Sequence, residues 1–286
     1  MTYRPHLYAG LQVLLQCLLN GGTLVIPDDG SSPASVADLM RVASVEYASA
    51  TPSYWRRLLL FADPKVLGEV PLKQITLGGE VVDQQILNSL KRVFPGTRIA
   101  HIYATTELGR CFSVTDGQAG FPTKYLFEPT NDGIEIRIEE GEIVVRSANS
   151  MLDYDNAGSG ASVGKWGCKT GDLVEVVGDR VFFVGRRTDM INVGGNKVHP
   201  IEIERVVRAV PGVVDTRVYG KKSSIAGELV CCQVVLAGDA SSAAIRQALS
   251  TACLTQLTPV QRPRLIDIVP EIRLDNSGKT NRRLTE

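Results

Sequence analysis

The chain has 286 residues, enough for one large domain or for two modest domains that each bury a core. Its 31 basic residues balance 31 acidic residues, and no stretch is basic enough to indicate a nucleic-acid partner. Hydrophobic residues make up 44% of the chain, an ordinary value for a globular protein, and no apolar run is long enough to predict a membrane span.

Residues 1–125 are predicted to form an α/β portion, because short apolar runs alternate with helical patterns and end in glycine-rich turns. Such alternation favours a mostly parallel sheet with helical crossovers. The expected strands are 22–27, 45–51, 74–79 and 98–104, and the expected helices lie near 33–43, 53–61 and 83–94.

The pattern changes in the following sixty residues. Residues 126–185 contain two hairpin-like pairs, around Glu140-Gly141 and Gly178-Asp179, which predict a small antiparallel β-unit. Residues 186–286 then predict a compact α+β domain, with a hinge between Arg186 and Asp189. Its expected elements are a helix at 200–209, strands at 214–220 and 228–237, and a helix at 241–257.

The six cysteines form no C-x-x-C pair and have no metal-ligand spacing with the three histidines. Reduced thiols in a cytoplasmic protein are the expectation. The opening decapeptide, MTYRPHLYAG, has no signal-peptide pattern and is expected to be an exposed loop.

Two strand ends carry residues suited to ligand binding. Gly78 and Gly79 follow a predicted buried strand and let a ligand approach the backbone, while the Glu80 carboxylate accepts hydrogen bonds. In HIYATTEL (101–108), the next strand ends in an aromatic ring, hydroxyls and a carboxylate, which suit a stacked base, a phosphate oxygen and a divalent cation. The alternatives are a simple glycine turn and a Thr-Glu helix start.

Two later segments add candidates. Asp172 follows Gly171 at a strand start, where it either binds ribose hydroxyls or closes a turn. The segment 184–204 joins a basic pair, a glycine turn and a proline-started helix.

Gly278-Lys279-Thr280, near the end of the chain, has the ending of a phosphate-binding P-loop. However, Arg273 stands where that loop needs its first glycine, so the motif does not predict a P-loop.

Four motifs in this order resemble the adenylate-forming (ANL) superfamily: acyl-CoA synthetases, peptide-synthetase adenylation domains and luciferases. They are Tyr103-Ala104-Thr105-Thr106-Glu107, with alanine where the family has glycine; Thr170-Gly171-Asp172; Gly185-Arg186, running on through Gly194-Gly195 to Pro200-Ile201-Glu202-Ile203-Glu204; and Ser277-Gly278-Lys279-Thr280-Asn281-Arg282.

The resemblance implies an α/β fold in two parts. Residues 1–185 would be the C-terminal portion of the family's large domain, and 186–286 its small, mobile α+β domain. The implied activity is that of an AMP-forming carboxylate ligase, which makes an acyl-adenylate and then a thioester. Its implied cofactors are ATP or AMP, Mg²⁺, and coenzyme A or phosphopantetheine.

The resemblance also implies a role for each site residue. Tyr103 would stack on adenine, Glu107 would hold Mg²⁺, and Lys279 would reach the carboxylate and α-phosphate while the adenylate forms. Thr188 stands at the hinge position where the family more often has aspartate or lysine. Gly78, Gly79 and Glu80 would line the adenine pocket, and Thr106 with its neighbour Thr105 would contact the α-phosphate. Asp172 and Arg186 would bind the ribose hydroxyls. Gly194 and Gly195 would line the channel for the pantetheine arm.

The family's main phosphate loop, which ends in Pro-Lys-Gly, should precede all of these motifs. The only candidate, DDGSSPASV at 28–36, has no lysine and comes too late in the chain. The sequence is therefore expected to be incomplete, roughly the C-terminal half to three-fifths of a member. Three explanations stay open: a partner chain supplies the missing half, the chain is a degenerate nucleotide- or acyl-binding module without catalysis, or it is a fragment of a longer protein.

The start of the chain bears on the substrate. Amino-acid adenylation domains place an aspartate in the corresponding region, but no acidic residue precedes Asp28. A non-amino carboxylic acid is favoured, and an amino-acid adenylation domain is the alternative. Apolar or aromatic walls for the acid are expected from Tyr8, Tyr54, Trp55 and Ala104.

Overall fold

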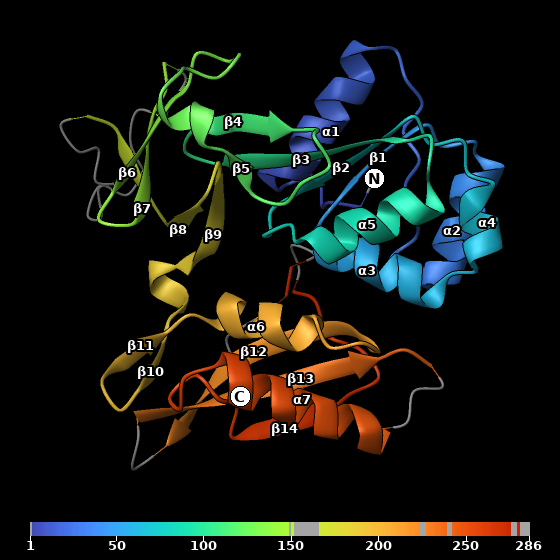
Figure 1. Ribbon diagram of the computed structural model, residues 1–286. Coiled ribbons are helices and arrows are strands. Elements are labelled where there is room, and N and C mark those ends of the chain that lie inside the picture. The colour runs from blue at the N-terminus through green and yellow to red at the C-terminus, as the bar shows by residue number, and fades with distance from the viewer. Residues whose placement is uncertain are drawn as a thin grey trace. The chain divides into compact units, whose positions relative to one another are not determined.

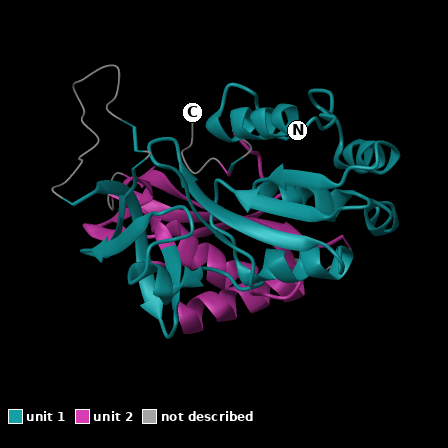
Figure 2. Cartoon of the chain, turned by 90° about the horizontal axis from the view of Figure 1, so that it is seen from above, with its two compact units in different colours: residues 1–183, 276–279 teal, residues 184–275, 280–286 magenta. Residues whose placement is uncertain are grey.

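The computed structural model describes residues 2–148, 150–151, 166–223, 227–238, 242–275 and 279–280 (Figure 1). The chain divides into two compact units (Figure 2). Unit 1 comprises Met1–Phe183 and Asn276–Lys279, and unit 2 comprises Val184–Asp275 and Thr280–Glu286. The domain boundary at residue 186 and the mobility of the second domain stay predictions.

The first sheet of unit 1 has the strand order β1-β2-β3-β4. The first three strands are parallel, and β4 runs antiparallel to β3. The prediction of a mostly parallel sheet is confirmed. The strands are β1 (Tyr47–Ala50), β2 (Gln74–Gly78), β3 (Arg98–Thr105) and β4 (Gly109–Val114), and the helices are α1 (Tyr8–Leu19), α2 (Pro33–Val42), α3 (Pro52–Phe61), α4 (Pro64–Gly68) and α5 (Gln84–Val93).

Four of these helices begin where the sequence supplies an N-terminal cap, among them α4, where Asp63 accepts the Lys65 amide. The side chains of Ser32, Thr51 and Asp83 each accept a hydrogen bond from a backbone amide in the first turn of α2, α3 and α5. Proline at the start of α2 and α3 fixes a helical φ without wasting an amide. The apolar faces of these helices pack on β2 around Trp55, Leu58, Leu67, Ile75, Leu77, Ile86 and Leu90.

Two predictions for the first thirty residues are wrong. Residues 22–27 form no strand, because β1 hydrogen-bonds to β2 alone within the described chain and an extended run without a partner gains no ladder. The opening decapeptide is not an exposed loop. Tyr3 is buried, and α1 begins at Tyr8.

The second sheet of unit 1 is antiparallel, with the order β5-β9-β8-β7-β6. Both predicted hairpins are confirmed, since Glu139 pairs with Glu142 and β9 follows β8 after a two-residue turn. Phe112 from β4 packs on Phe121, so both sheets of unit 1 contribute to this core. The elements are β5 (Phe121–Pro122), the 3₁₀ turn η1 (Thr123–Leu126), β6 (Glu135–Glu139), β7 (Glu142–Arg146), β8 (Cys168–Val177) and β9 (Arg180–Arg186).

Unit 2 is a five-stranded sheet with the order β11-β10-β13-β12, and β14 pairs with β13. Helices α6 and α7 pack on it through Ile203, Val207, Ile245 and Leu249. The predicted α+β pattern is confirmed. The elements are the 3₁₀ turn η2 (Arg187–Asp189), β10 (Ile191–Val193), β11 (Asn196–Val198), α6 (Pro200–Arg208), β12 (Val213–Ser223), β13 (Gly227–Leu236), α7 (Ser242–Gln256) and β14 (Leu265–Ile268).

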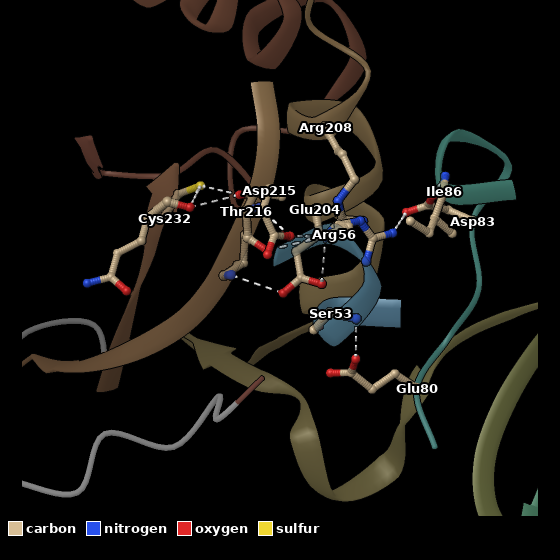
Figure 3. Close-up of polar contacts among 12 residues, drawn as sticks. Ser53, Arg56, Glu80, Asp83, Ile86, Glu204, Arg208, Asp215, Thr216 and Cys232 are labelled. Atoms are coloured by element: carbon tan, nitrogen blue, oxygen red, sulfur yellow. Dashed lines mark hydrogen bonds and ion pairs between the residues drawn. The ribbon is translucent and has the colours of Figure 1, made fainter. Parts of the chain in front are cut away.

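A buried polar cluster ties α6 to β12 (Figure 3). The Glu204 carboxylate accepts the Val218 amide at 3.0 Å and lies 3.8 Å from the Arg208 guanidinium. Arg208 also lies 3.7 Å from Asp215 and donates to the Thr216 carbonyl at 3.2 Å. Because Glu204 is only 2% exposed, its charge depends on these partners rather than on water.

Replacing Glu204 by glutamine is expected to destabilise unit 2 by about 1–3 kcal/mol, because a neutral amide faces Arg208 in place of a buried carboxylate. Hydrogen exchange of the α6 and β12 amides measures this free energy of opening. Glu202→Gln on the same helix is the control: the new amide oxygen still accepts the Gln261 side chain, and little change is expected. Equal effects of the two substitutions would contradict the role of the cluster.

Candidate functional site

The glycine turn after β2 lies at the carboxyl edge of the first sheet. Gly79 has φ +85°, and a Cβ there would lie 3.1 Å from Cε of Lys279 and 3.8 Å from Cγ2 of Thr51. Glycine is therefore required for both the backbone conformation and the close approach of the lysine. On the other side, the Tyr3 hydroxyl donates to the Gly78 carbonyl at 3.3 Å.

Glu80, next along the turn, is engaged with a helix end. Its carboxylate accepts the Ser53 amide at 3.0 Å, at the start of α3 (Figure 3). Asp83 then accepts the Ile86 amide at 3.0 Å and binds the buried Arg56 guanidinium at 2.5 Å. These contacts tie the segment between β2 and α5 to α3, which holds the glycine turn in place.

Tyr103 lies near the carboxyl end of β3 and joins the two sheets of unit 1. Its ring packs on Phe112 and Phe183, with centroids 5.2 and 5.0 Å apart, and its hydroxyl donates to the Asp172 carboxylate at 2.7 Å. Burial and the charge of Asp172 raise the pKa of Tyr103 well above its ordinary value. The hydroxyl therefore stays protonated, and remains a donor, at physiological pH.

After Tyr103 the chain makes a tight turn into β4, so the alternative of a helix start at this point is wrong. Thr105 Oγ1 accepts the Leu108 amide at 3.1 Å and closes the turn, while Thr106 is exposed. Glu107 is half-buried, and its carbonyl accepts the Met151 amide at 2.7 Å. Burial first, and then the charges of Glu107 and Glu142, raise the pKa of the Cys168 thiol.

Asp172 is buried within β8, the central strand of the second sheet, at a bulge where the register with β7 shifts and the backbone makes a local turn. Gly171 has φ +75°, which favours glycine, and its amide donates to the Glu142 carboxylate at 2.8 Å. Thr170 Oγ1 donates to the Ile143 carbonyl at 2.9 Å and accepts the Asp172 amide at 3.2 Å. The backbone turn is thus a bulge inside a strand, and the ribose contact of Asp172 stays a prediction.

Strand register explains why these residues converge. Gly78 pairs with Ile102 in parallel, so the glycine turn and the Tyr103–Glu107 segment emerge at the same edge of the sheet. In open α/β sheets ligands bind at this edge. Tyr103 then brings Asp172 to it, and Lys279 lies beside Gly79. The arrangement offers an aromatic ring, hydroxyls, a carboxylate, a lysine and an open backbone turn, which together suit a nucleotide.

Three other predicted residues lie in unit 2. Arg186 is the last residue of β9 and is exposed. Gly194 and Gly195 form the turn between β10 and β11, with open space around both Cα atoms, and the Gly195 amide donates to Asn192 Oδ1 at 3.0 Å. Their contacts with ligands stay predictions. Ser277, Gly278 and Arg282 lie outside the described residues.

One predicted wall of the acid pocket is wrong. Trp55 is 1% exposed and packs edge-on against Phe94, with centroids 6.2 Å apart, so it belongs to the core of unit 1. Its place at i+3 from Pro52, on the inner face of α3, was the signal for burial. Tyr8 and Tyr54 are half-buried, and Ala104 is exposed.

For two residues near the site, the sequence contained no indication of their structural role. Glu142 reads as one position in an alternating strand, yet it binds the turn that presents Asp172. Arg180 reads as a surface residue at a strand start, yet it is buried and binds the carbonyls of Gln118, Ala119 and Gly120. Their partners lie 29 or more residues away, beyond the reach of local patterns.

All six cysteines are free thiols. Within the described residues, no group of three or more His, Cys, Asp or Glu side chains is arranged to hold a metal ion. None of the described helices combines the length and apolar character needed to cross a membrane.

Comparison with known protein families shows to which family the chain belongs. Residues 5–155 match the AMP-binding enzyme family, and residues 202–279 match the AMP-binding enzyme C-terminal domain. The chain belongs to the AMP-binding enzyme family. The adenylate-forming superfamily that the four motifs indicated is thereby confirmed.

Curated relatives of this chain include ligases of several kinds. It is 28% identical to the 4-chlorobenzoate–CoA ligase of an Arthrobacter species, over 97% of this chain and 55% of the relative. It is 25% identical to the medium/long-chain-fatty-acid–[acyl-carrier-protein] ligase FadD10 of Mycobacterium tuberculosis, over 98% of this chain and 57% of the relative. The chain spans about half the length of the curated relatives it matches.

Solved structures agree on the fold. ATP-bound MatB from Rhodopseudomonas palustris aligns with a TM-score of 0.75 at 22% identity, covering 98% of this chain and 57% of that one. The anthranilate CoA ligase AuaEII in complex with anthranoyl-AMP aligns with a TM-score of 0.74 at 21% identity, covering 91% and 52%. The chain therefore has the α/β fold of part of an adenylating enzyme's large domain, followed by its small α+β domain.

Proposed function

We propose that this chain carries the AMP-binding and lysine-bearing part of an AMP-forming carboxylate ligase. The observation that carries the proposal is the convergence of the Gly78-Gly79 turn, the Tyr103–Glu107 segment and Asp172 at one sheet edge. Family membership and the ligase relatives support the reaction class. The reaction joins a carboxylate to the α-phosphate of ATP, releases pyrophosphate, and then passes the acyl group to a thiol.

The nucleotide contacts follow from the position of each residue. Tyr103 offers an aromatic face to adenine, and the turn backbone lets the base approach closely. Asp172 would accept hydrogen bonds from ribose hydroxyls, and the resemblance implies Arg186 as a second ribose contact. The exposed Thr106 hydroxyl is available to the α-phosphate. Because Glu80 already binds the Ser53 amide, its part in the pocket is to hold the turn.

Glu107 is the residue that would hold Mg²⁺. Magnesium in nucleotide sites is usually bound by one or two carboxylates together with substrate phosphates, so a single protein carboxylate fits. The neighbouring Thr106 hydroxyl adds an oxygen donor. When bound, the ion would neutralise the charge that develops on the phosphates as pyrophosphate leaves.

Lys279 would act on the first half-reaction. Its Cε lies beside Gly79, at the same edge as the proposed α-phosphate position, where a cation stabilises negative charge on the reacting oxygens. In the second half-reaction we propose that residues 186–286 move as a domain. The open Gly194-Gly195 turn would then line the path of a pantetheine arm, from coenzyme A or from a carrier protein.

The proposed acid is a carboxylic acid without an amino group, because no acidic side chain precedes Asp28 to pair with an ammonium. Tyr8, Tyr54 and Ala104 remain candidate walls. The alternative is an amino acid. A 28% identical relative, from Pseudomonas fluorescens, is an L-proline–[L-prolyl-carrier protein] ligase, covered over 49% of its length.

The rest of the large domain is the partner we propose for an uncovered apolar face of unit 1. Leu11, Leu15 and Leu18 recur at helical spacing on α1, and all three are exposed. Tyr47, on the edge strand β1, is 66% exposed. Relatives have nearly twice the length of this chain, and a polypeptide equivalent to their remaining part would cover this face. It would also supply the phosphate loop.

Carboxylate-dependent exchange between ATP and pyrophosphate tests the proposed reaction. It should be measured for the chain alone and together with the polypeptide that supplies the rest of the large domain. We expect exchange in the second case. No exchange in either case, combined with no AMP binding, would exclude the ligase. AMP binding without exchange in either case would favour the alternative, a non-catalytic nucleotide-binding module.

The chain alone is expected to bind AMP at least as tightly as ATP. Charge-assisted hydrogen bonds to the β- and γ-phosphates are worth about 1.5–3 kcal/mol each, and no lysine-bearing phosphate loop occurs in the sequence. Without two or three of these phosphate hydrogen bonds, ATP binding weakens by on the order of 10³-fold. Calorimetric titration measures both affinities, with Asp172→Asn as a control that weakens both alike. A tenfold preference of the unmodified chain for ATP would reveal a triphosphate site and contradict the prediction.

A further inference from the structure

The carboxylate proposed to bind ribose is held from two sides. Tyr103, 69 residues away in sequence, donates its hydroxyl to Oδ2 of Asp172 at 2.7 Å. Glu142, on the adjacent strand β7, accepts the Gly171 amide at 2.8 Å and so anchors the backbone of the same turn. Both Asp172 and Glu142 are buried, with 6% and 4% exposure.

We infer that Tyr103 and Glu142 are positioning residues for the Asp172 carboxylate, through which they set the affinity of the site for the ribose of a nucleotide. The inference rests on the proposed function. It gives Tyr103 a second task besides offering its ring, and it assigns a task to Glu142, which none of the four motifs includes.

The hydrogen bond from Tyr103 decides which way the carboxylate turns. An aspartate side chain has several rotamers, and only one presents an oxygen to a ligand in a given place. Since Tyr103 engages Oδ2, the carboxylate is held in one of these orientations. The donor is itself fixed, because the ring packs on Phe112 and Phe183. Preorganised in this way, the carboxylate loses less side-chain entropy when ribose binds.

Glu142 acts on the backbone of the turn. Gly171 adopts φ +75°, and its amide points at the Glu142 carboxylate. A charge-assisted hydrogen bond to a backbone amide is stronger than a neutral one, so it holds this turn conformation firmly. Thr170 adds a bond to the next amide in the chain. The Cα of Asp172 is thus fixed by β7 while its carboxylate is fixed by β3.

The test compares AMP with 2′,3′-dideoxy-AMP, which lacks both ribose hydroxyls. Calorimetry on the whole chain gives a ratio of the two affinities, and this ratio reports ribose recognition alone. Tyr103→Phe keeps the ring but removes the donor. We expect it to lower AMP affinity about tenfold and to change dideoxy-AMP affinity by no more than about twofold. The ratio of AMP affinity to dideoxy-AMP affinity should therefore fall several-fold.

Three further variants keep the test specific. Tyr125→Phe removes a hydroxyl from the same aromatic cluster, where it donates to the Ser113 carbonyl, and should leave the ratio unchanged. Glu142→Ala should lower the ratio, whereas Glu142→Gln should restore most of it, because the amide oxygen still accepts the Gly171 amide. Thermal unfolding of each variant checks that it is folded.

The possible outcomes separate the inference from the proposed function. If the unmodified chain binds neither nucleotide, both are wrong. If it binds AMP, and Tyr103→Phe keeps the full ratio while folded, the positioning role is wrong and the AMP site stands. A Glu142→Gln variant as impaired as Glu142→Ala would remove Glu142 from the inference.

Discussion

Replacing Arg180 by methionine is expected to destabilise unit 1 by about 3–5 kcal/mol. The main reason is that three backbone carbonyls lose the donors of a buried guanidinium, and a buried acceptor left unsatisfied costs about 1–3 kcal/mol. Asp116, the ion-pair partner, is itself 36% exposed and contributes less. The Arg180 side chain is 8% exposed and forms an ion pair with Asp116. It also donates to the carbonyls of Gln118, Ala119 and Gly120 at 2.8–3.2 Å. Methionine fills much of the volume but leaves all of these acceptors without their donor.

The loop that Arg180 holds connects parts of unit 1. Gln84 of α5 binds the Gly117 carbonyl and the Ala119 amide, and His101 of β3 lies 3.0 Å from the Gln118 carbonyl. Arg180 therefore fixes β9 to the α/β sheet that carries the candidate site. We expect Arg180→Met to weaken AMP binding as well as stability.

Urea unfolding and hydrogen exchange of the 116–120 amides measure the effect. Arg110→Met is the matched control. Arg110 also binds an aspartate, Asp132, at 2.7 Å, but the two side chains are 55% and 36% exposed. An exposed pair of this kind contributes about 1 kcal/mol or less. If both substitutions cost the same, the buried network contributes nothing beyond a surface pair.

The effect of Arg180→Met is expected to depend on pH. Burial alone would raise the pKa of Asp116, but the hydrogen bond and charge of Arg180 lower it below its ordinary value. A carboxyl whose pKa is lowered by folding contributes stability above its unfolded pKa of about 3.9 and loses it as pH falls through the folded value. The difference between the unmodified chain and Arg180→Met should therefore shrink below about pH 4.

Replacing Lys279 by alanine is expected to slow acyl-adenylate formation about 10²–10³-fold, which corresponds to roughly 3–4 kcal/mol of transition-state stabilisation. Negative charge develops on oxygen as pyrophosphate leaves, and Lys279 is the cation whose Cε lies beside the Gly79 turn. Transfer of the acyl group from preformed acyl-adenylate to a thiol should proceed at the unmodified rate, because that step needs no cation at the departing pyrophosphate.

The two half-reactions are measured separately, by ATP–pyrophosphate exchange and by thioester formation from supplied acyl-adenylate, in the preparation that supports exchange. Lys65→Ala, on the exposed surface of α4, is the control for removal of a lysine and should affect neither step. Equal damage to both half-reactions by Lys279→Ala would show that the lysine is structural, or serves the thiol step as well.

Local patterns determined most of the secondary structure and pointed to the candidate site residues. Capping residues and apolar periodicity placed α2, α3 and α5, and the glycine-rich strand ends marked β2 and β3. The order of four motifs identified the superfamily. Both signals are local in the chain, since a cap, a turn or a short motif depends on residues within a few positions of one another.

Only the tertiary structure decided which strand, side chain or backbone group each of these residues contacts. The apolar run at 22–27 satisfies a strand pattern but finds no neighbouring strand in the described chain. Trp55 fits a substrate wall and a core equally well by type, and packing against Phe94 made it core. Glu142 and Tyr103 meet the Asp172 turn across 29–69 residues of sequence. Periodicity reports that a face is buried, but hydrogen bonds and packing across such separations depend on strand order and register, which no local pattern specifies.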